Sequence, residues 1–322
     1  MENQALGLAE AVQRLFSSRI AVKRIRWRKA FDKLPSALKA LWMLDPSSDP
    51  VEPAAGEAWP DLWIATGRAT LPLSARVRAL SGGRTFVVQT QDPRWRNDAY
   101  DLIVAPAHDG VVGTNVLSVT GSPHRVTAER LAEGAAVFAD RLEPLPRPRV
   151  AALIGGRSSA FDLTEVQAAV LADRIAAAVE AAGGSLMLTF SRRTPEAAKA
   201  AMTARLAHLP GLIWNGEGAN PYFAFLNFAD HILVTEDSAN MAAEAASTGA
   251  PVHILPMIPL KAADKFARLH ADLRERGAAR PFDGSLNVWS YAPLTETDRA
   301  AQEILARLMT ASPRSRQAAP RQ

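Results

Sequence analysis

The segment that most constrains the fold is HILVTEDSANMAAEAASTGAPVHILP, residues 231–256. It predicts a buried strand at His231–Val234, an alanine-rich helix at Ala239–Thr248 that stops at Gly249, and a second strand at Val252–Leu255. Apolar runs of four residues between turn residues are typical of strands that are covered on both faces, as in parallel sheets. The segment therefore predicts one short βαβ unit of a parallel α/β sheet.

Polar side chains follow the first of these strands. Ligands of open parallel sheets bind beyond the carboxyl ends of the strands. The candidate ligand residues at this turn are Thr235, Glu236, Asp237, Ser238 and Asn240. Ser238 is placed to cap the helix, whose first amides and positive dipole end attract a phosphate oxygen.

Glu244 lies six residues after Ser238, about one and a half helical turns deeper. A carboxylate at that depth can accept both hydroxyls of a ribose. The alternative hypothesis is purely structural: Asp237 and Ser238 only cap the helix, and Glu244 is a solvated helix residue.

The length and composition favour a two-domain soluble protein. The chain has 322 residues, and single cores tend to split above about 250–300 residues. The composition, 48% hydrophobic and 22% charged, is that of a globular protein. No apolar run reaches the roughly 18 residues that span a bilayer, and Met1 is followed by a polar, helix-forming segment, so we expect a cytoplasmic location.

Cysteine content and charge restrict the chemistry further. The absence of cysteine excludes disulfides, thiolate metal sites and cysteine nucleophiles. The net charge of +4 fits phosphorylated substrates or an anionic membrane surface, and no nucleic-acid-binding module is present.

The N-terminal half begins with helix spacing at Glu2–Phe16 and then alternates strands with helices or loops. The expected strands are Leu62–Gly67, Thr85–Gln89, Leu102–Ala105 and Val116–Val119. The polar residues that follow these strands include Gln89, Asp92, Arg94, His108, Asp109 and His124. His108 or Asp109 could serve as a general base. Adjacent residues of an extended chain point to opposite sides, so we do not expect a hydrogen-bonded dyad.

Residues 19–42 combine basic side chains with tryptophans and aliphatic residues. One hypothesis is peripheral contact with an anionic membrane, at about 1 kcal/mol for each basic charge near the surface. The other is a solvated loop and helix whose aromatic side chains belong to the core.

A second α/β domain begins after the proline-rich linker Glu143–Arg149. We therefore expect an N-terminal domain at 1–148 and a C-terminal domain at 149–294, with the helix 295–309 packing back on the first domain and a disordered tail at 311–322.

Two turns of the second domain are candidates for binding a phosphate. Gly155 and Gly156 follow the strand Val150–Ile154, although their spacing does not match a dinucleotide or nucleoside triphosphate motif. Ser191 and Arg192 follow the strand Leu186–Phe190 in the sequence SRRTP, where arginine suits bidentate contact with a phosphate.

Six ordered segments carry a family resemblance. They are ENQALGLAEA, FVVQTQDPR, DLIVAPAHD, LIGGRSSAFDL, TFSRRTP and TEDSANMAAEAASTGAPVHI. Together they resemble the plant mitochondrial-fission (elongated mitochondria) family, whose bacterial members are regarded as candidate glycosyltransferases of the GT-B architecture. The resemblance covers Glu2 to Met309.

The resemblance implies two Rossmann-like domains that face a cleft, with the acceptor side in the N-terminal half and a nucleotide-sugar donor in the C-terminal half. By similarity to the lipid-linked N-acetylglucosamine transferase of peptidoglycan synthesis, Glu244 would hold the donor ribose. Ser238 and Asn240, at the start of the helix, would face the diphosphate, with help from Gly155, Gly156, Ser191 and Arg192, and Asp237 would belong to the same donor-binding site. The resemblance implies neither a metal nor a cofactor, and the sequence has no Asp-x-Asp element. Gln89, Asp92 and Arg94 would lie on the acceptor side.

The start of the chain departs from the family pattern. Relatives usually open with a strand and a glycine-rich loop before the Glu-Asn-Gln segment, whereas here that segment follows Met1 directly. The first strand is therefore expected to be missing, either because the start codon is assigned too late, which we favour, or because part of the acceptor site has been lost.

Three functional hypotheses follow. The first is a GT-B glycosyltransferase that moves a sugar from a nucleotide-diphosphate donor to a lipid-linked or cell-envelope glycan acceptor. The second is a non-catalytic adaptor at a membrane surface. The third is a sugar-nucleotide epimerase.

Overall fold

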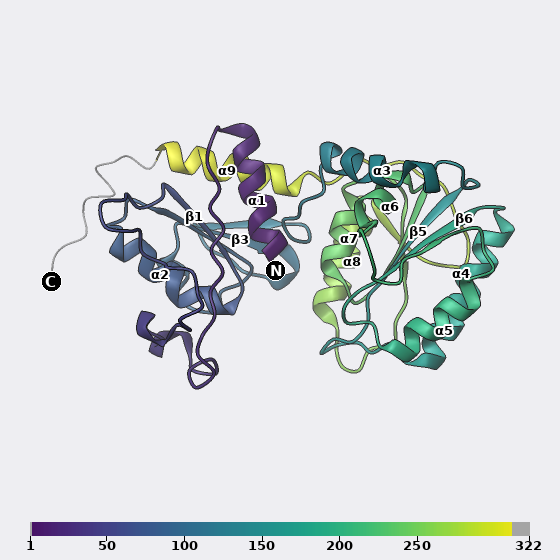
Figure 1. Cartoon of the computed structure of the whole chain (residues 1–322), viewed down its shortest axis with the longest axis horizontal. Coiled ribbons are helices and arrows are strands. Elements are labelled where there is room, and N and C mark those ends of the chain that lie inside the picture. The colour runs from purple at the N-terminus through teal and green to yellow at the C-terminus, as the bar shows by residue number, and fades with distance from the viewer. Residues whose placement is uncertain (1, 311–322) are drawn as a thin grey trace. The chain divides into compact units, whose positions relative to one another are not determined.

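The computed structural model describes residues 2–310, so the tail predicted at 311–322 lies outside the described residues. The described residues form two compact units: unit 1 consists of residues 2–125 with 295–310, and unit 2 of Val126–Leu294. Each unit contains one sheet of parallel strands with helices on both of its faces (Figure 1). The predicted α/β class with two doubly wound parallel sheets is confirmed.

The sheet of unit 1 has four strands in the order β1-β2-β3-β4, and every neighbouring pair is parallel. Its strands are β1 (Leu62–Thr66), β2 (Phe86–Thr90), β3 (Leu102–Pro106) and β4 (Val116–Val119), and its helices are α1 (Glu2–Leu15), α2 (Leu71–Leu80) and α9 (Glu296–Thr310). Helices α1 and α9 pack against each other over one face of this sheet, and α2 covers the other face (Figure 1).

Alternation along β2 and β3 explains these two layers. Val88 and Val104 lie in the core under α1 and α9, whereas Val87 and Ile103 lie in the core under α2. Strands with both faces covered in this way are continuous apolar runs, which is the pattern that the sequence shows.

Gly7 allows α1 to lie close to the backbone at His124. A Cβ atom at Gly7 would lie 2.3 Å from the carbonyl oxygen of His124, which is too close for any side chain. The packing of α1 therefore requires glycine at this position.

The sheet of unit 2 has six parallel strands in the order β10-β9-β8-β5-β6-β7. They are β5 (Arg149–Ile154), β6 (Ser185–Phe190), β7 (Gly211–Ile213), β8 (His231–Thr235), β9 (Val252–Leu255) and β10 (Ala279–Pro281). The helices are α3 (Ala128–Leu142), α4 (Glu165–Ala181), α5 (Glu196–Leu206), α6 (Tyr222–Phe228), α7 (Ala239–Ala246) and α8 (Asp264–Glu275).

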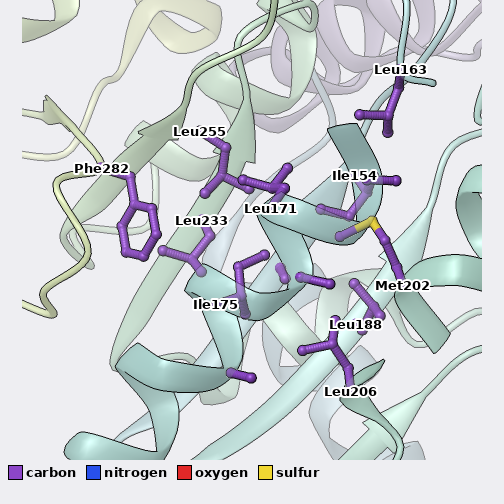
Figure 2. Packing of buried hydrophobic residues seen from close by; sticks show 14 of the residues in the cluster. Ile154, Leu163, Leu171, Ile175, Leu188, Met202, Leu206, Leu233, Leu255 and Phe282 are labelled. Carbon is purple, nitrogen blue, oxygen red and sulfur yellow. The ribbon is translucent and has the colours of Figure 1, made fainter. Parts of the chain in front are cut away.

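The two faces of this sheet carry separate cores. Helices α4 and α5 cover one face, where Leu171 and Ile175 of α4 pack with Ile154, Leu188 and Leu233 from the strands (Figure 2). The core on the other face draws its helical side chains from α3, α6, α7 and α8. Because β5 and β8 lie at the centre of the sheet, the loops that follow them are held by the most buried part of unit 2.

The observed boundary between the units differs from the predicted one at 148/149. It falls at Arg125/Val126, ahead of α3, because Phe138 and Leu142 of α3 are buried in the core of unit 2. Contact between α3 and α6 is close: a Cβ atom at Gly134 would lie 2.7 Å from the Cβ atom of Phe223. The proline-rich linker thus connects α3 to β5 within one unit.

Candidate functional site

The predicted βαβ segment forms β8, α7 and β9, and β8 lies beside the central strand β5. Ser238 caps α7 by accepting a hydrogen bond from the Met241 amide at 3.4 Å, which is a long contact. The carboxyl ends of β5, β6 and β8 are neighbours in this parallel sheet. The loops that follow these three strands therefore form the candidate site.

Asp237 is the centre of these loops. Its carboxylate, fully buried, accepts hydrogen bonds from the Thr235 hydroxyl at 2.8 Å and from the Gly156 amide at 3.1 Å. The guanidinium of Arg193 pairs with the same carboxylate at 2.8 Å and is 42% exposed. The Thr235 hydroxyl also accepts the Gly155 amide at 2.7 Å. Asp237 thus ties the turn after β8 to the loops after β5 and β6.

Gly155 and Gly156 provide the space for this arrangement. A Cβ atom at Gly155 would lie 1.9 Å from Oδ1 of Asp237, and one at Gly156 would lie 2.4 Å from the carbonyl oxygen of Arg193. Their amides already donate to Thr235 and Asp237. The glycine pair therefore allows three loops to pack closely, and both of its N–H groups are used within the protein.

The two adjacent arginines after β6 have different surroundings. Arg193 is held by Asp237, whereas Arg192 is exposed and has no ion-pair partner among residues 2–310. The loop itself is fixed by Thr194, whose hydroxyl lies 3.2 Å from that of Ser191 and also hydrogen-bonds to the carbonyl of Gly155. Arg192 is consequently the cation of this loop that remains available to an anionic ligand.

Glu244 lies on α7, where it is partly buried. Its Oε2 atom accepts a hydrogen bond from the hydroxyl of Tyr222 at 2.5 Å. Burial raises the pKa of Glu244 to about 7, although the Tyr222 hydrogen bond acts in the opposite direction. Sequence reasoning missed Tyr222, which precedes Glu244 by 22 residues; the only local signal is a hydroxyl-bearing ring at the start of a short helix.

The turn after β8 is also braced from α8 and from the segment after β9. The Nε2 atom of His270 lies 2.9 Å from the carbonyl oxygen of Glu236, and the Glu236 carboxylate accepts the Met257 amide at 3.1 Å. Burial lowers the pKa of His270, which favours its neutral form. Glu236 therefore has a structural contact on both its backbone and its side chain.

In unit 1, His108 and Asp109 lie in a 3-10 turn, Ala107–Asp109, immediately after β3. His108 Nε2 is 3.8 Å from Asp109 Oδ1, and the side chains are 4% and 14% exposed. The tight turn brings the two side chains to the same side, which an extended chain would not do. At 3.8 Å they are too far apart for a hydrogen bond, as the sequence led us to expect.

The other candidates in unit 1 have local roles. Gln89 is buried and accepts a hydrogen bond from Ser74 of α2 at 3.3 Å, so it faces the helix layer. Asp92 accepts the Arg94 amide at 2.8 Å, which holds Arg94 in a left-handed backbone conformation with φ of +50°. His124 is buried, and its pKa is lowered to about 4 by that burial.

One polar contact at the carboxyl edge of this sheet was not predicted. The side-chain carbonyl of Gln4 accepts hydrogen bonds from Gln91 at 2.8 Å and from Thr66 at 3.2 Å. The Glu-Asn-Gln segment of α1 is thereby attached to the ends of β1 and β2.

Similar solved structures include a UDP-GlcNAc 2-epimerase and MurG. The UDP-GlcNAc 2-epimerase from Methanocaldococcus jannaschii has a TM-score of 0.45 and 15% identity, covering 76% of this chain and 69% of that one. MurG from Acinetobacter baumannii has a TM-score of 0.39 and 17% identity, covering 80% of this chain and 70% of that one. Likenesses this weak carry no information about substrate.

Sequence comparisons show which family the chain belongs to. The Mitochondrial fission protein ELM1 of Arabidopsis thaliana is 32% identical over 272 residues, which cover 76% of this chain but only 63% of the plant protein. An uncharacterized protein of Rickettsia prowazekii is 24% identical over 311 residues, covering 84% of this chain and 86% of that one. The model of the family described as Mitochondrial fission ELM1 matches residues 1–308. This chain therefore belongs to the mitochondrial fission ELM1 family.

Proposed function

We propose that unit 2 binds a nucleotide-diphosphate sugar, and that the chain transfers the sugar to a lipid-linked or cell-envelope glycan without a metal. The observation that carries this proposal is the arrangement of α7 at the carboxyl edge of the sheet. A carboxylate lies along the helix at Glu244, Ser238 caps the start of the helix, and Arg192, which has no ion-pair partner among residues 2–310, belongs to a neighbouring loop.

In this proposal each group has a defined chemical role. Glu244 accepts the hydroxyls of the ribose, while the first turn of α7, with Ser238 and Asn240, receives the diphosphate. Ser191 and Arg192 add a hydroxyl and a positive charge. Gly155, Gly156 and Asp237 keep the three loops together and act on the donor through that packing.

The transfer forms one bond and breaks another. The acceptor hydroxyl oxygen bonds to the anomeric carbon as the bond from that carbon to the diphosphate oxygen breaks, and the nucleoside diphosphate leaves. Arg192 and the helix start stabilise the charge that develops on the leaving diphosphate. Asp109, the more exposed member of the pair in unit 1, is our candidate base for the acceptor proton, with His108 as the other candidate.

Thermal-shift measurements with uridine, guanosine, cytidine and thymidine diphosphates test the donor site. A nucleotide at about 100 times its Kd adds about 2.7 kcal/mol to the free energy of unfolding. For a unit of this size that corresponds to roughly 5–11 °C in melting temperature. Glu244→Ala and Arg192→Ala should abolish or weaken the shift, whereas Glu180→Ala, which removes an exposed carboxylate on α4, should leave it unchanged.

The outcomes separate the alternatives. A well-folded protein that no nucleotide stabilises would contradict a donor site. If the protein is instead incubated with a nucleotide sugar and no acceptor, conversion of that sugar to its epimer, detected by NMR, would indicate a sugar-nucleotide epimerase.

A second candidate function is that of an adaptor at an anionic membrane surface, and one observation favours it. Trp42 is 64% exposed and Leu38 63% exposed, and the Trp42 ring packs edge-on against Phe31 at 5.2 Å. Trp27, by contrast, is buried and donates its indole N–H to the Ala69 carbonyl, so the aromatic residues of 19–42 divide between core and surface. No helix within residues 2–310 has the length and apolarity to cross a bilayer.

Co-sedimentation with phosphatidylserine vesicles tests the membrane hypothesis. Neutralising Lys23, Arg24, Arg26 and Arg28 together should remove up to about 4 kcal/mol of binding free energy, at roughly 1 kcal/mol for each charge. Trp42→Ala should weaken binding independently of salt. Equal sedimentation of wild type and the neutralised variant would exclude this surface.

A further inference from the structure

Tyr222 is held rigidly at the start of α6. Its amide donates to the side-chain oxygen of Asn220 at 3.0 Å, and the next residue, Phe223, packs against Gly134 of α3. Its hydroxyl points to α7, where it donates to Oε2 of Glu244 at 2.5 Å. The position of the phenol is thus determined by helix packing on both sides.

This contact occupies one of the two oxygen atoms of the Glu244 carboxylate. Within residues 2–310, Tyr222 provides the hydrogen bond to Oε2, and no protein group donates to Oε1. An ionised carboxylate has about four acceptor positions on its two oxygens. Tyr222 therefore sets the plane of the carboxylate and leaves acceptor positions for a ligand that offers two neighbouring hydroxyls.

The charges of Tyr222 and Glu244 also favour an arrangement in which the phenol donates and the carboxylate accepts. Burial and the adjacent carboxylate raise the pKa of Tyr222 well above 10, so the phenol remains a donor at every physiological pH. Helix α7 packs against β8, β9 and α8, and it meets α6 through this contact. Among the described residues of these elements, Tyr222 is the one titratable side chain in contact with Glu244, and its hydrogen bond favours the ionised carboxylate.

We propose that Tyr222 is the positioning residue for ribose recognition: it orients the Glu244 carboxylate and keeps it an acceptor, so that the site prefers ribonucleotides to 2′-deoxyribonucleotides. This inference rests on the proposed donor site of unit 2. It assigns the preference for ribose to two side chains from different helices, of which only Glu244 contacts the sugar.

The test compares Tyr222→Phe with Tyr291→Phe, a matched control in unit 2 whose hydroxyl donates to the Ala250 carbonyl at 2.9 Å. The probe is the nucleoside diphosphate that stabilises the wild type, alongside its 2′-deoxy form. At pH 7, Tyr222→Phe should bind the ribonucleotide several-fold more weakly, because without the phenol the Glu244 pKa rises above about 7 and a smaller fraction of the carboxylate is ionised. The preference for ribose should fall, whereas Tyr291→Phe should match the wild type.

A pH profile separates positioning from general loss of structure. Without the phenol the Glu244 pKa rises, so the pH at which Tyr222→Phe reaches half-maximal affinity should move upward from about 7 and part of the affinity should return at pH 9. An unchanged affinity ratio and pH midpoint would overturn the role of Tyr222 alone. If wild type binds none of the four nucleotides, both this inference and the donor site fail.

A second measurement avoids substitution of Tyr222. The chain has three tyrosines, so 3-fluorotyrosine labelling yields a simple ¹⁹F NMR spectrum, and Tyr100→Phe and Tyr291→Phe assign the remaining signal by elimination. The Tyr222 signal should titrate near pH 7 with Glu244 and should move more with the ribonucleotide than with its 2′-deoxy form. A Tyr222 signal whose chemical shift changes neither with pH nor with the nucleotide would overturn the proposal.

Discussion

Substituting Gly155 by alanine should destabilise unit 2 before it affects any ligand. The new Cβ atom would lie 1.9 Å from Oδ1 of Asp237 and 2.6 Å from Cγ and from Oδ2. The Asp237 side chain has no exposed surface, so it cannot move into solvent. It must move against its partners Thr235, Gly156 and Arg193.

The magnitude follows from the contacts that are lost. Overpacking a well-packed interior costs about 1–3 kcal/mol, and breaking a buried ion pair costs about 3–5 kcal/mol. Arg193 is partly exposed, so part of the second cost is relieved by solvent. We expect Gly155→Ala to lose about 3–5 kcal/mol of unfolding free energy, which corresponds to a fall of roughly 6–20 °C in melting temperature.

Urea denaturation followed by circular dichroism measures this loss, and hydrogen exchange of the β5 and β8 amides locates it in unit 2. Gly216→Ala is the matched control, because Gly216 has φ of +96° but no atom within 4 Å of its Cβ position. Its expected cost is about 1–2 kcal/mol of backbone strain. The reasoning is refuted if Gly155→Ala is as stable as Gly216→Ala but loses nucleotide binding, because Gly155 would then make room for the ligand.

Three further predictions concern acid, charge and helix packing. Burial lowers the pKa of His253 to about 4, and it contacts the similarly buried His231, so stability should be constant above about pH 6.5 and fall as the pH drops toward 4. The expected loss is about 2 kcal/mol by pH 5 in urea titrations, and His253→Phe should flatten this dependence. Arg193→Ala should lower the free energy of unfolding by about 1–3 kcal/mol, because Asp237 loses its ion-pair partner. Arg192→Ala should change the free energy of unfolding by no more than about 0.5 kcal/mol and affect only nucleotide affinity. Equal melting curves for the two variants would contradict this prediction. Gly7→Val should displace α1 from the carbonyl oxygen 2.3 Å away and speed hydrogen exchange in β2 and β3; wild-type exchange rates would show that α1 packs elsewhere.

Most elements could be predicted from local pattern. The strand at Val252–Leu255 has the predicted bounds, and the strand predicted at His231–Val234 ends one residue later, at Thr235. Both segments combine an apolar run of the right length with turn residues at their ends, and these signals act over a few neighbours. The strand Ala279–Pro281 was missed, because a three-residue edge strand exists only through its pairing with β9.

The extent of the two units depended on distant contacts. Helix α3 has an apolar stripe that would suit either sheet, and a proline-rich linker follows it, so the sequence favoured a boundary at the linker. Its actual place in unit 2 results from close packing at Gly134 against α6, more than eighty residues later.

Two parallel α/β sheets with polar loops at their carboxyl ends could be predicted from the sequence, because strand periodicity, turn residues and helix caps are local properties. The contacts of each polar side chain in those loops depend on the tertiary structure. In the folded chain Arg193 pairs with Asp237, whereas Arg192 is exposed. The amides of Gly155 and Gly156 donate hydrogen bonds to other residues of the loops, and Tyr222 donates one to Glu244. Hydrogen bonds and ion pairs between loops depend on distances that no residue spacing specifies, so adjacent residues of the same type can end with different roles.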